Sequence, residues 1–161
     1  MIRPTTPEDT DALRAIAAGT GVFKPTELEA LVEVLDDYHD ANREYGHIAT
    51  TLELHGRPAG FAYYAPAAMT DRTWYLYWIA VDKNVHAKGL GTRLLHRAEA
   101  DVQAAGGRLF LIETSSLPQY DLTRKFYVKH GYETHAVLRD YYADGDDMVI
   151  FRKHFGRSAK A

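Results

Sequence analysis

Short apolar runs alternate along this chain with segments whose apolar residues recur at helical spacing. The run YLYWIAV at 75–81 is aromatic and β-branched and too short for a helix, so it predicts a buried strand. Similar patterns predict six further strands, at 2–4, 47–54, 58–64, 109–114, 132–139 and 148–152. Turn residues at 55–58 predict a hairpin, and the polar segment 140–147 predicts a turn-rich connection between the last two strands.

Helices are predicted where capping residues precede apolar positions spaced three and four apart. Thr6 and Pro7 suit the start of the first helix, because a hydroxyl can cap the turn and proline fits its first position. The four predicted helices run from Pro7 to Gly19 or Gly21, from Pro25 to about Asp40, from Gly89 to about Ala104, and from Asp121 or Thr123 to Gly131.

Length and composition bound the class of protein. The 161 residues, 46% hydrophobic and 25% charged, fit one domain, which we expect over 1–155 with a flexible tail at 156–161. The absence of cysteine excludes disulfides, thiolate catalysis and Cys-zinc sites. A net charge of −3 argues against nucleic acid as the main partner. No signal peptide or membrane-spanning run is apparent, so we expect a cytoplasmic protein, and the eight scattered histidines predict no metal site.

A small, basic, glycine-containing segment, His86 to Gly91, separates the strand at 75–81 from the helix that follows. The first backbone N–H groups of a helix have no intrahelical partner, so this segment predicts an anion cradle, to which Lys88 and Arg93 add positive charge. The P-loop and Rossmann patterns are absent. Gly89-x-Gly91 alone is equally well explained as a helix start that needs a flexible residue.

The wider spacing is more specific. His86-x-x-Gly89-x-Gly91 resembles the acyl-CoA-binding motif of the GNAT acetyltransferases, Gln/Arg-x-x-Gly-x-Gly/Ala, with His86 departing from it at the first position. Independently, Phe126-Tyr127-x-Lys129-x-Gly131-Tyr132 is similar to the family's FYxKxGF. The resemblance covers about 1–155 and is strongest over 74–132. It implies an α/β fold with a central mixed, mostly antiparallel sheet, helices on both faces, and a splay beside the CoA loop.

The resemblance also implies the cosubstrate and the residues that bind it. Acetyl-CoA would donate its acetyl group to a primary amine by direct attack in a ternary complex, without a metal. The backbone of 79–81 would pair with pantetheine, and 86–92 would hold the pyrophosphate. The expected cofactor-binding residues are Ile79, Ala80, Val81, His86, Ala87, Lys88, Gly89, Leu90, Gly91 and Thr92.

Two residues are predicted to be catalytic. Glu113 ends an apolar strand, where burial raises a carboxyl pKa toward the range of a general base; a solvated glutamate is the alternative. No acid occurs at 73–78, the strand on which many family members carry their base. By the resemblance, the Tyr127 hydroxyl meets the CoA sulfur as the acid, and a core tyrosine is the alternative.

The sequence says less about the residues that bind the acceptor amine. The segment from Arg139 to Ile150 resembles the closing hairpin of the ribosomal-protein alanine N-acetyltransferases, whose Tyr-Tyr pair flanks a peptide N-terminus. Tyr141, Tyr142 and Phe23 are therefore expected at the acceptor, with ordinary packing as the alternative. The acceptor is a small-molecule amine or a peptide N-terminus, and a homodimer is left open. A non-catalytic acyl-CoA-sensing domain is the competing function, although it would need neither Glu113 nor Tyr127.

Overall fold

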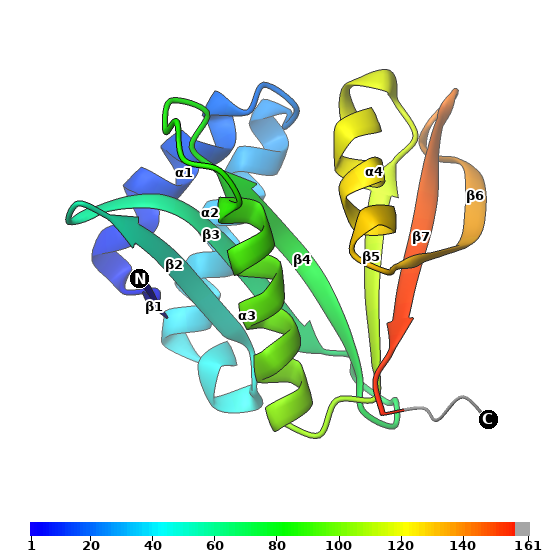
Figure 1. Ribbon diagram of the computed structural model, residues 1–161, viewed down its shortest axis with the longest axis horizontal. Coiled ribbons are helices and arrows are strands. Elements are labelled where there is room, and N and C mark those ends of the chain that lie inside the picture. The colour runs from blue at the N-terminus through cyan, green and yellow to red at the C-terminus, as the bar shows by residue number, and fades with distance from the viewer. Residues whose placement is uncertain (157–161) are drawn as a thin grey trace.

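The structure, a computed structural model, describes residues 1–156 (Figure 1). These residues form a seven-stranded sheet in the order β1-β2-β3-β4-β5-β7-β6. Its strands are β1 Ile2–Pro4, β2 Ile48–Leu54, β3 Arg57–Pro66, β4 Thr73–Val81, β5 Leu109–Ser115, β6 Glu133–Ala143 and β7 Asp146–His154. Neighbours are antiparallel except β4 and β5, which are parallel. The predicted mixed, mostly antiparallel sheet is confirmed. Of the predicted tail, 157–161 lie outside the described residues.

Helices cover both faces of this sheet, as predicted (Figure 1). The helical elements are the 3₁₀ turns η1 Pro7–Asp9, η2 Asn42–Tyr45 and η3 Pro118–Tyr120, and the α-helices α1 Thr10–Gly19, α2 Pro25–Asp40, α3 Leu90–Ala104 and α4 Asp121–Lys129. One face packs against α1 and α2, the other against α3 and α4. Among residues 1–156, no helix is both long enough and apolar enough to cross a membrane.

Strand β3 shows how one strand serves two cores. Its alternate side chains point to opposite faces, so Phe61 and Tyr63 join the cluster under α1 and α2, while Ala62 and Tyr64 join the cluster under α3. A run that is buried on both faces is continuously apolar, which is why this strand was visible in the sequence.

A bulge and a divergence shape the middle of the sheet. Tyr63 pairs with Trp78 and Tyr64 with Leu76, so Tyr77 is an extra residue in β4. Strands β4 and β5 pair from Thr73 with Leu109 to Leu76 with Ile112, and no further. Beyond that point β4 continues beside β3 and β5 beside β7, so the two strands separate, as the expected splay requires.

The predicted turn-rich connection at 140–147 is wrong. Strand β6 continues to Ala143 and β7 begins at Asp146, leaving only Asp144 and Gly145 as the turn. Asp140, at φ 58°, makes this continuation feasible: its N–H donates to Asp147 Oδ1, and its own Oδ1 accepts the N–H of Gly145. Acidic residues therefore stabilise a bulged hairpin from within, whereas by composition alone they are typical of a loop.

The first helical segment begins as predicted, with Thr6 as the cap and Pro7 at the first position, but its first turn is not α-helical. A 3₁₀ turn, η1, occupies Pro7–Asp9, and the α-helix follows from Thr10. Thr6 and Asp9 form a capping box, and Arg3 binds both carboxylate oxygens of Asp9, at 2.8 and 2.9 Å. This ion pair lowers the pKa of Asp9 to about 2 and fastens the start of the helix to β1.

The connection from α3 to β5 depends on a close approach at Gly107. A Cβ added there would lie 2.3 Å from Val102 Cγ1 and 3.0 Å from Trp74 Cδ1. We therefore expect Gly107→Ala to lower the free energy of unfolding by about 1–3 kcal/mol through overpacking, measured by urea denaturation. Gly19→Ala is the matched control. Gly19 lies in the last turn of α1, and a Cβ added to it would contact only Lys83 Cε, at 3.9 Å. An unchanged midpoint for Gly107→Ala would contradict this packing.

Candidate active site

A cleft of about 810 Å³ opens where β4 and β5 separate. Its walls come from the loop between α1 and α2, the second half of β4, the end of β5, η3 with α4, and the β6–β7 hairpin. Because β4 no longer pairs with β5 beyond Leu76, the β4 backbone from Tyr77 to Val81 has an edge without a neighbouring strand on this side. An exposed strand edge can hydrogen-bond an extended ligand.

The bulge at Tyr77 places aromatic rings along the cleft. The extra residue interrupts the alternation of β4, so the neighbours Tyr77 and Trp78 both lie on the α1–α2 side, where Tyr77 contacts Tyr63 and Trp78 contacts Phe23. The Trp78 and Phe23 ring centroids are 5.1 Å apart. Tyr75 stacks on Tyr77 with centroids 5.5 Å apart.

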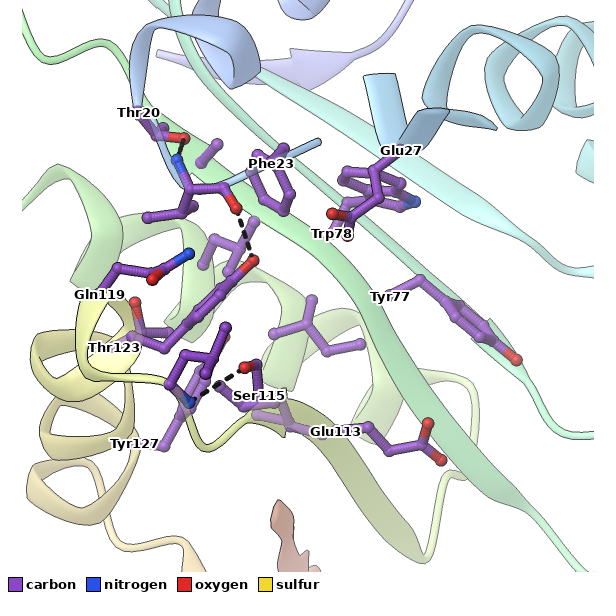
Figure 2. Close-up of a pocket in the computed structure, with 18 of the residues that line it drawn as sticks. Thr20, Phe23, Glu27, Tyr77, Trp78, Glu113, Ser115, Gln119, Thr123 and Tyr127 are labelled. Atoms are coloured by element: carbon purple, nitrogen blue, oxygen red, sulfur yellow. Dashed lines mark hydrogen bonds between the residues drawn. The ribbon is translucent and has the colours of Figure 1, made fainter. Parts of the chain in front are cut away.

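Tyr127 reaches the cleft from α4 (Figure 2). Its ring is 3% exposed and packs against Phe126, Tyr132 and Phe151. Within residues 1–156 its hydroxyl makes no hydrogen bond to the protein, and it is not one of the fully buried unpaired polar atoms, so it is accessible from the cleft that Tyr127 lines. Burial raises the pKa of Tyr127 well above its ordinary value, so the phenol is protonated at neutral pH and can donate a proton. The alternative of a core tyrosine accounts for the buried ring, whereas the hydroxyl is accessible from the cleft.

Glu113 lies on β5 and lines the same cleft from the opposite face of the strand. Its neighbours Ile112 and Thr114 are buried on the α3–α4 side, so Glu113 points to the other side, away from Tyr127 in Figure 2. Its side chain is exposed at the cleft mouth. Partial burial nevertheless raises its pKa, and the nearby Tyr75 hydroxyl partly opposes that shift. A raised pKa together with solvent access suits a general base.

The predicted CoA loop has an open helix start. Gly89, at φ 77°, is the N-cap of α3, and 86–89 are exposed. Gly91 lines the cleft, and a Cβ added there would lie 3.5 Å from the Phe126 ring. The amides of the first turn have no partner within the helix, so they fit a phosphate group.

The side chains of this loop do not all face a ligand. The Leu90 side chain is buried in the core, and the Thr92 hydroxyl lies 3.1 Å from His130 Nε2. Any contact of Leu90 with phosphate would therefore come from its backbone, and the Thr92 hydroxyl already has one side-chain partner. His86 and Lys88 are exposed outside the cleft lining, while Ile79, Ala80 and Val81 line it.

Only two of the three predicted acceptor residues line the cleft. Phe23 and Tyr142 line the cleft, whereas Tyr141 is 58% exposed and contacts Tyr142 at 5.0 Å between centroids without lining the cleft. Among residues 1–156, no group of three or more metal-ligating side chains is found.

Several cleft residues were missed in the sequence, because they come from segments far apart in the chain. They are Lys24, Glu27, Trp78, Tyr120 and Asp146. Tyr120 donates a hydrogen bond to the Val22 carbonyl at 3.0 Å, joining η3 to the α1–α2 loop across the cleft. The only sequence signal at Glu27 was its position in the cap of a helix. That capping role accounts for a glutamate at this position, so the sequence offered no reason to expect a ligand there.

Known proteins share both the sequence pattern and the fold. A model of the acetyltransferase (GNAT) family matches residues 12–132. An uncharacterized N-acetyltransferase of Methanocaldococcus jannaschii is 27% identical over 112 residues, which are 68% of this chain and 67% of that protein. The crystal structure of a putative GNAT acetyltransferase from Desulfovibrio desulfuricans is 35% identical, with a TM-score of 0.91, over 96% of this chain and 98% of that one.

More distant structures share the fold. An aminoglycoside 6'-N-acetyltransferase complexed with coenzyme A has a TM-score of 0.76 at 17% identity, over 98% of both chains. The ribosomal-protein-alanine N-acetyltransferase from Brucella melitensis has a TM-score of 0.79 at 18% identity, over 96% of this chain and 99% of that one. With the family match spanning most of the sequence, and with a cleft of this construction, the chain belongs to the GNAT acetyltransferase family and is an N-acetyltransferase.

Proposed function

We propose that the protein transfers the acetyl group of acetyl-CoA directly to a primary amine in a ternary complex, with Glu113 as general base and Tyr127 as general acid. The observation that carries this proposal is the Tyr127 hydroxyl, which has no hydrogen-bond partner among residues 1–156 although its ring is buried. A thiolate leaving group would give this hydroxyl a partner during the reaction.

Acetyl-CoA would bind where β4 and β5 separate. Pantetheine would hydrogen-bond the exposed β4 backbone at 79–81, and the pyrophosphate would lie on the amides at the start of α3. This arrangement points the thioester into the cleft between Tyr127 and Glu113, which line it from opposite sides of β5. The coenzyme A bound to a structural relative of this fold agrees with such a donor.

The reaction needs two proton movements. The neutral amine nitrogen attacks the thioester carbonyl, forming the C–N bond, and the C–S bond then breaks. Glu113 takes the proton that the amine loses, directly or through a water molecule, because its raised pKa keeps it basic enough to do so. Tyr127 donates its phenolic proton to the thiolate, which leaves as free CoA. No covalent acyl-enzyme is required, and the chain has no cysteine to form one.

Removing the Tyr127 hydroxyl should separate catalysis from binding. We expect Tyr127→Phe to lower kcat about 10²-fold, the usual contribution of a general acid, while the calorimetric Kd for acetyl-CoA stays close to that of the wild type. Tyr45→Phe, an exposed tyrosine outside the cleft lining, is the matched control and should keep full activity. Full turnover in Tyr127→Phe would show that another group or water protonates the thiolate.

The pH profile tests Glu113. Because a protonated carboxyl cannot take a proton, kcat/KM of the wild type should fall as the pH decreases through the Glu113 pKa, which burial places above the ordinary glutamate range. Glu113→Gln should lower kcat/KM about 10²-fold and remove this acidic limb. Glu133→Gln, which replaces an exposed strand glutamate, should keep the wild-type profile. A Glu113→Gln enzyme that retains the acidic limb would rule Glu113 out as the base.

A further inference from the structure

The acceptor side of the cleft is acidic. Among residues 1–156, four charged residues line the cleft: the carboxylates of Glu27, Glu113 and Asp146, and the cation Lys24. Lys24 is exposed at the rim, and the remaining lining residues are uncharged. The Tyr127 hydroxyl, which has no hydrogen-bond partner among residues 1–156, opens into the same cavity and points to a ligand there independently of these charges.

The three carboxylates share one electrostatic environment. Burial, and after it the charges of Glu27 and Asp146, raise the pKa of Tyr120 to about 12. Burial, and after it charges that include Glu113 and Asp146, raise the pKa of Tyr142 to about 12 as well. Asp146 already accepts a hydrogen bond from Ser115 Oγ, at 2.5 Å. Asp146 is also buried, at 6% exposed, whereas Glu27 is half-buried and Glu113 is exposed, so Glu27 and Glu113 are the carboxylates that a ligand can reach.

Glu27 needs only one of its oxygens for the fold. Oε1 accepts the Lys24 backbone N–H at 2.9 Å and caps α2. Among residues 1–156, Oε2 has no hydrogen-bond or ion-pair partner. The carboxylate lines the cleft across from Glu113, and the strand that carries Tyr77 and Trp78 runs between the two acids in Figure 2.

We propose that the acceptor is a diamine or longer polyamine, with one amine reacting beside Glu113 and a second ammonium bound by Glu27 against the rings of Tyr77 and Trp78. This rests on the proposed function. A carboxylate gives the ammonium a charge-assisted hydrogen bond, and the aromatic faces attract the cation and cover the alkyl chain. Only the reacting nitrogen loses a proton, so the second one stays charged. A monoamine, or a peptide whose only amine is its N-terminus, would leave Glu27 unpaired.

Matched acceptors and variants test this. We would measure kcat/KM for 1,4-diaminobutane, butylamine and a lysine-free peptide beginning with alanine, in the wild type, Glu27→Gln and Glu29→Gln. Glutamine keeps the capping acceptor but removes the charge. Glu29 is an exposed acid on α2 outside the cleft lining, so it controls for net charge.

The expected result is a change of preference. In the wild type the diamine should exceed butylamine about tenfold or more in kcat/KM, and Glu27→Gln should lower this ratio about tenfold, the size of one charge-assisted contact. Glu29→Gln should keep the wild-type ratio. Equal kcat/KM for the two amines, a preference for the peptide, or a ratio unchanged in Glu27→Gln would overturn the proposal.

A binding measurement separates this proposal from the proposed reaction. 1,4-Diaminobutane is titrated calorimetrically into wild type and Glu27→Gln, each saturated with free CoA so that no turnover occurs. Binding that weakens in Glu27→Gln, without acetyl transfer to any amine, would support the diamine site and overturn the reaction. Acetylation of both amines with equal kcat/KM would leave the reaction standing and overturn the diamine site. If the protein neither binds nor acetylates the diamine, the diamine site is also overturned.

Discussion

The parallel pairing of β4 with β5 ends at Leu76 and Ile112, and the candidate active site depends on that end. Up to this point the two strands belong to one continuous sheet, held by α3 and by the close packing at Gly107. Beyond it, each strand is held by its other neighbour, so the strands can diverge without unfolding. The divergence leaves backbone groups of β4 without strand partners, which a folded protein tolerates where water or a ligand can pair with them.

Charge is divided along the cleft in a way that matches two substrates of opposite sign. At the start of α3, free amides provide positive potential for a phosphate-bearing donor, and the exposed Lys88 and Arg93 add to it from outside the cleft lining. On the acceptor side, Glu27 and Glu113 provide negative potential. An anionic donor, once bound, would strengthen the attraction for a cationic acceptor. The splay thus separates two binding environments within one cavity, and the proposed proton donor and acceptor lie on opposite faces of β5.

Local patterns predicted most of the secondary structure. The buried strands at 75–81 and 109–114, the glycine-marked helix from 89 to 104 and the second helix up to Asp40 all agree with the structure to within a few residues. They were visible because burial on both faces requires continuous apolar runs, and because a helix start requires particular residues. The extension of the last two strands into 140–147 was missed, since the acidic residues there satisfy backbone groups inside a bulge and thereby resemble a loop.

The sequence by itself determined the elements, the family resemblance and the placement of Glu113 and Tyr127 on a strand and a helix, because each depends on residues near one another in the chain. Only the tertiary structure decided which groups meet. Among residues 1–156, it left the Tyr127 hydroxyl without a hydrogen-bond partner, kept Tyr141 out of the cleft lining and brought Glu27 and Glu113 to the same cleft. These outcomes depend on the β4 bulge and on the point where β4 and β5 separate, which are set by packing between distant segments and carry no local sequence signal.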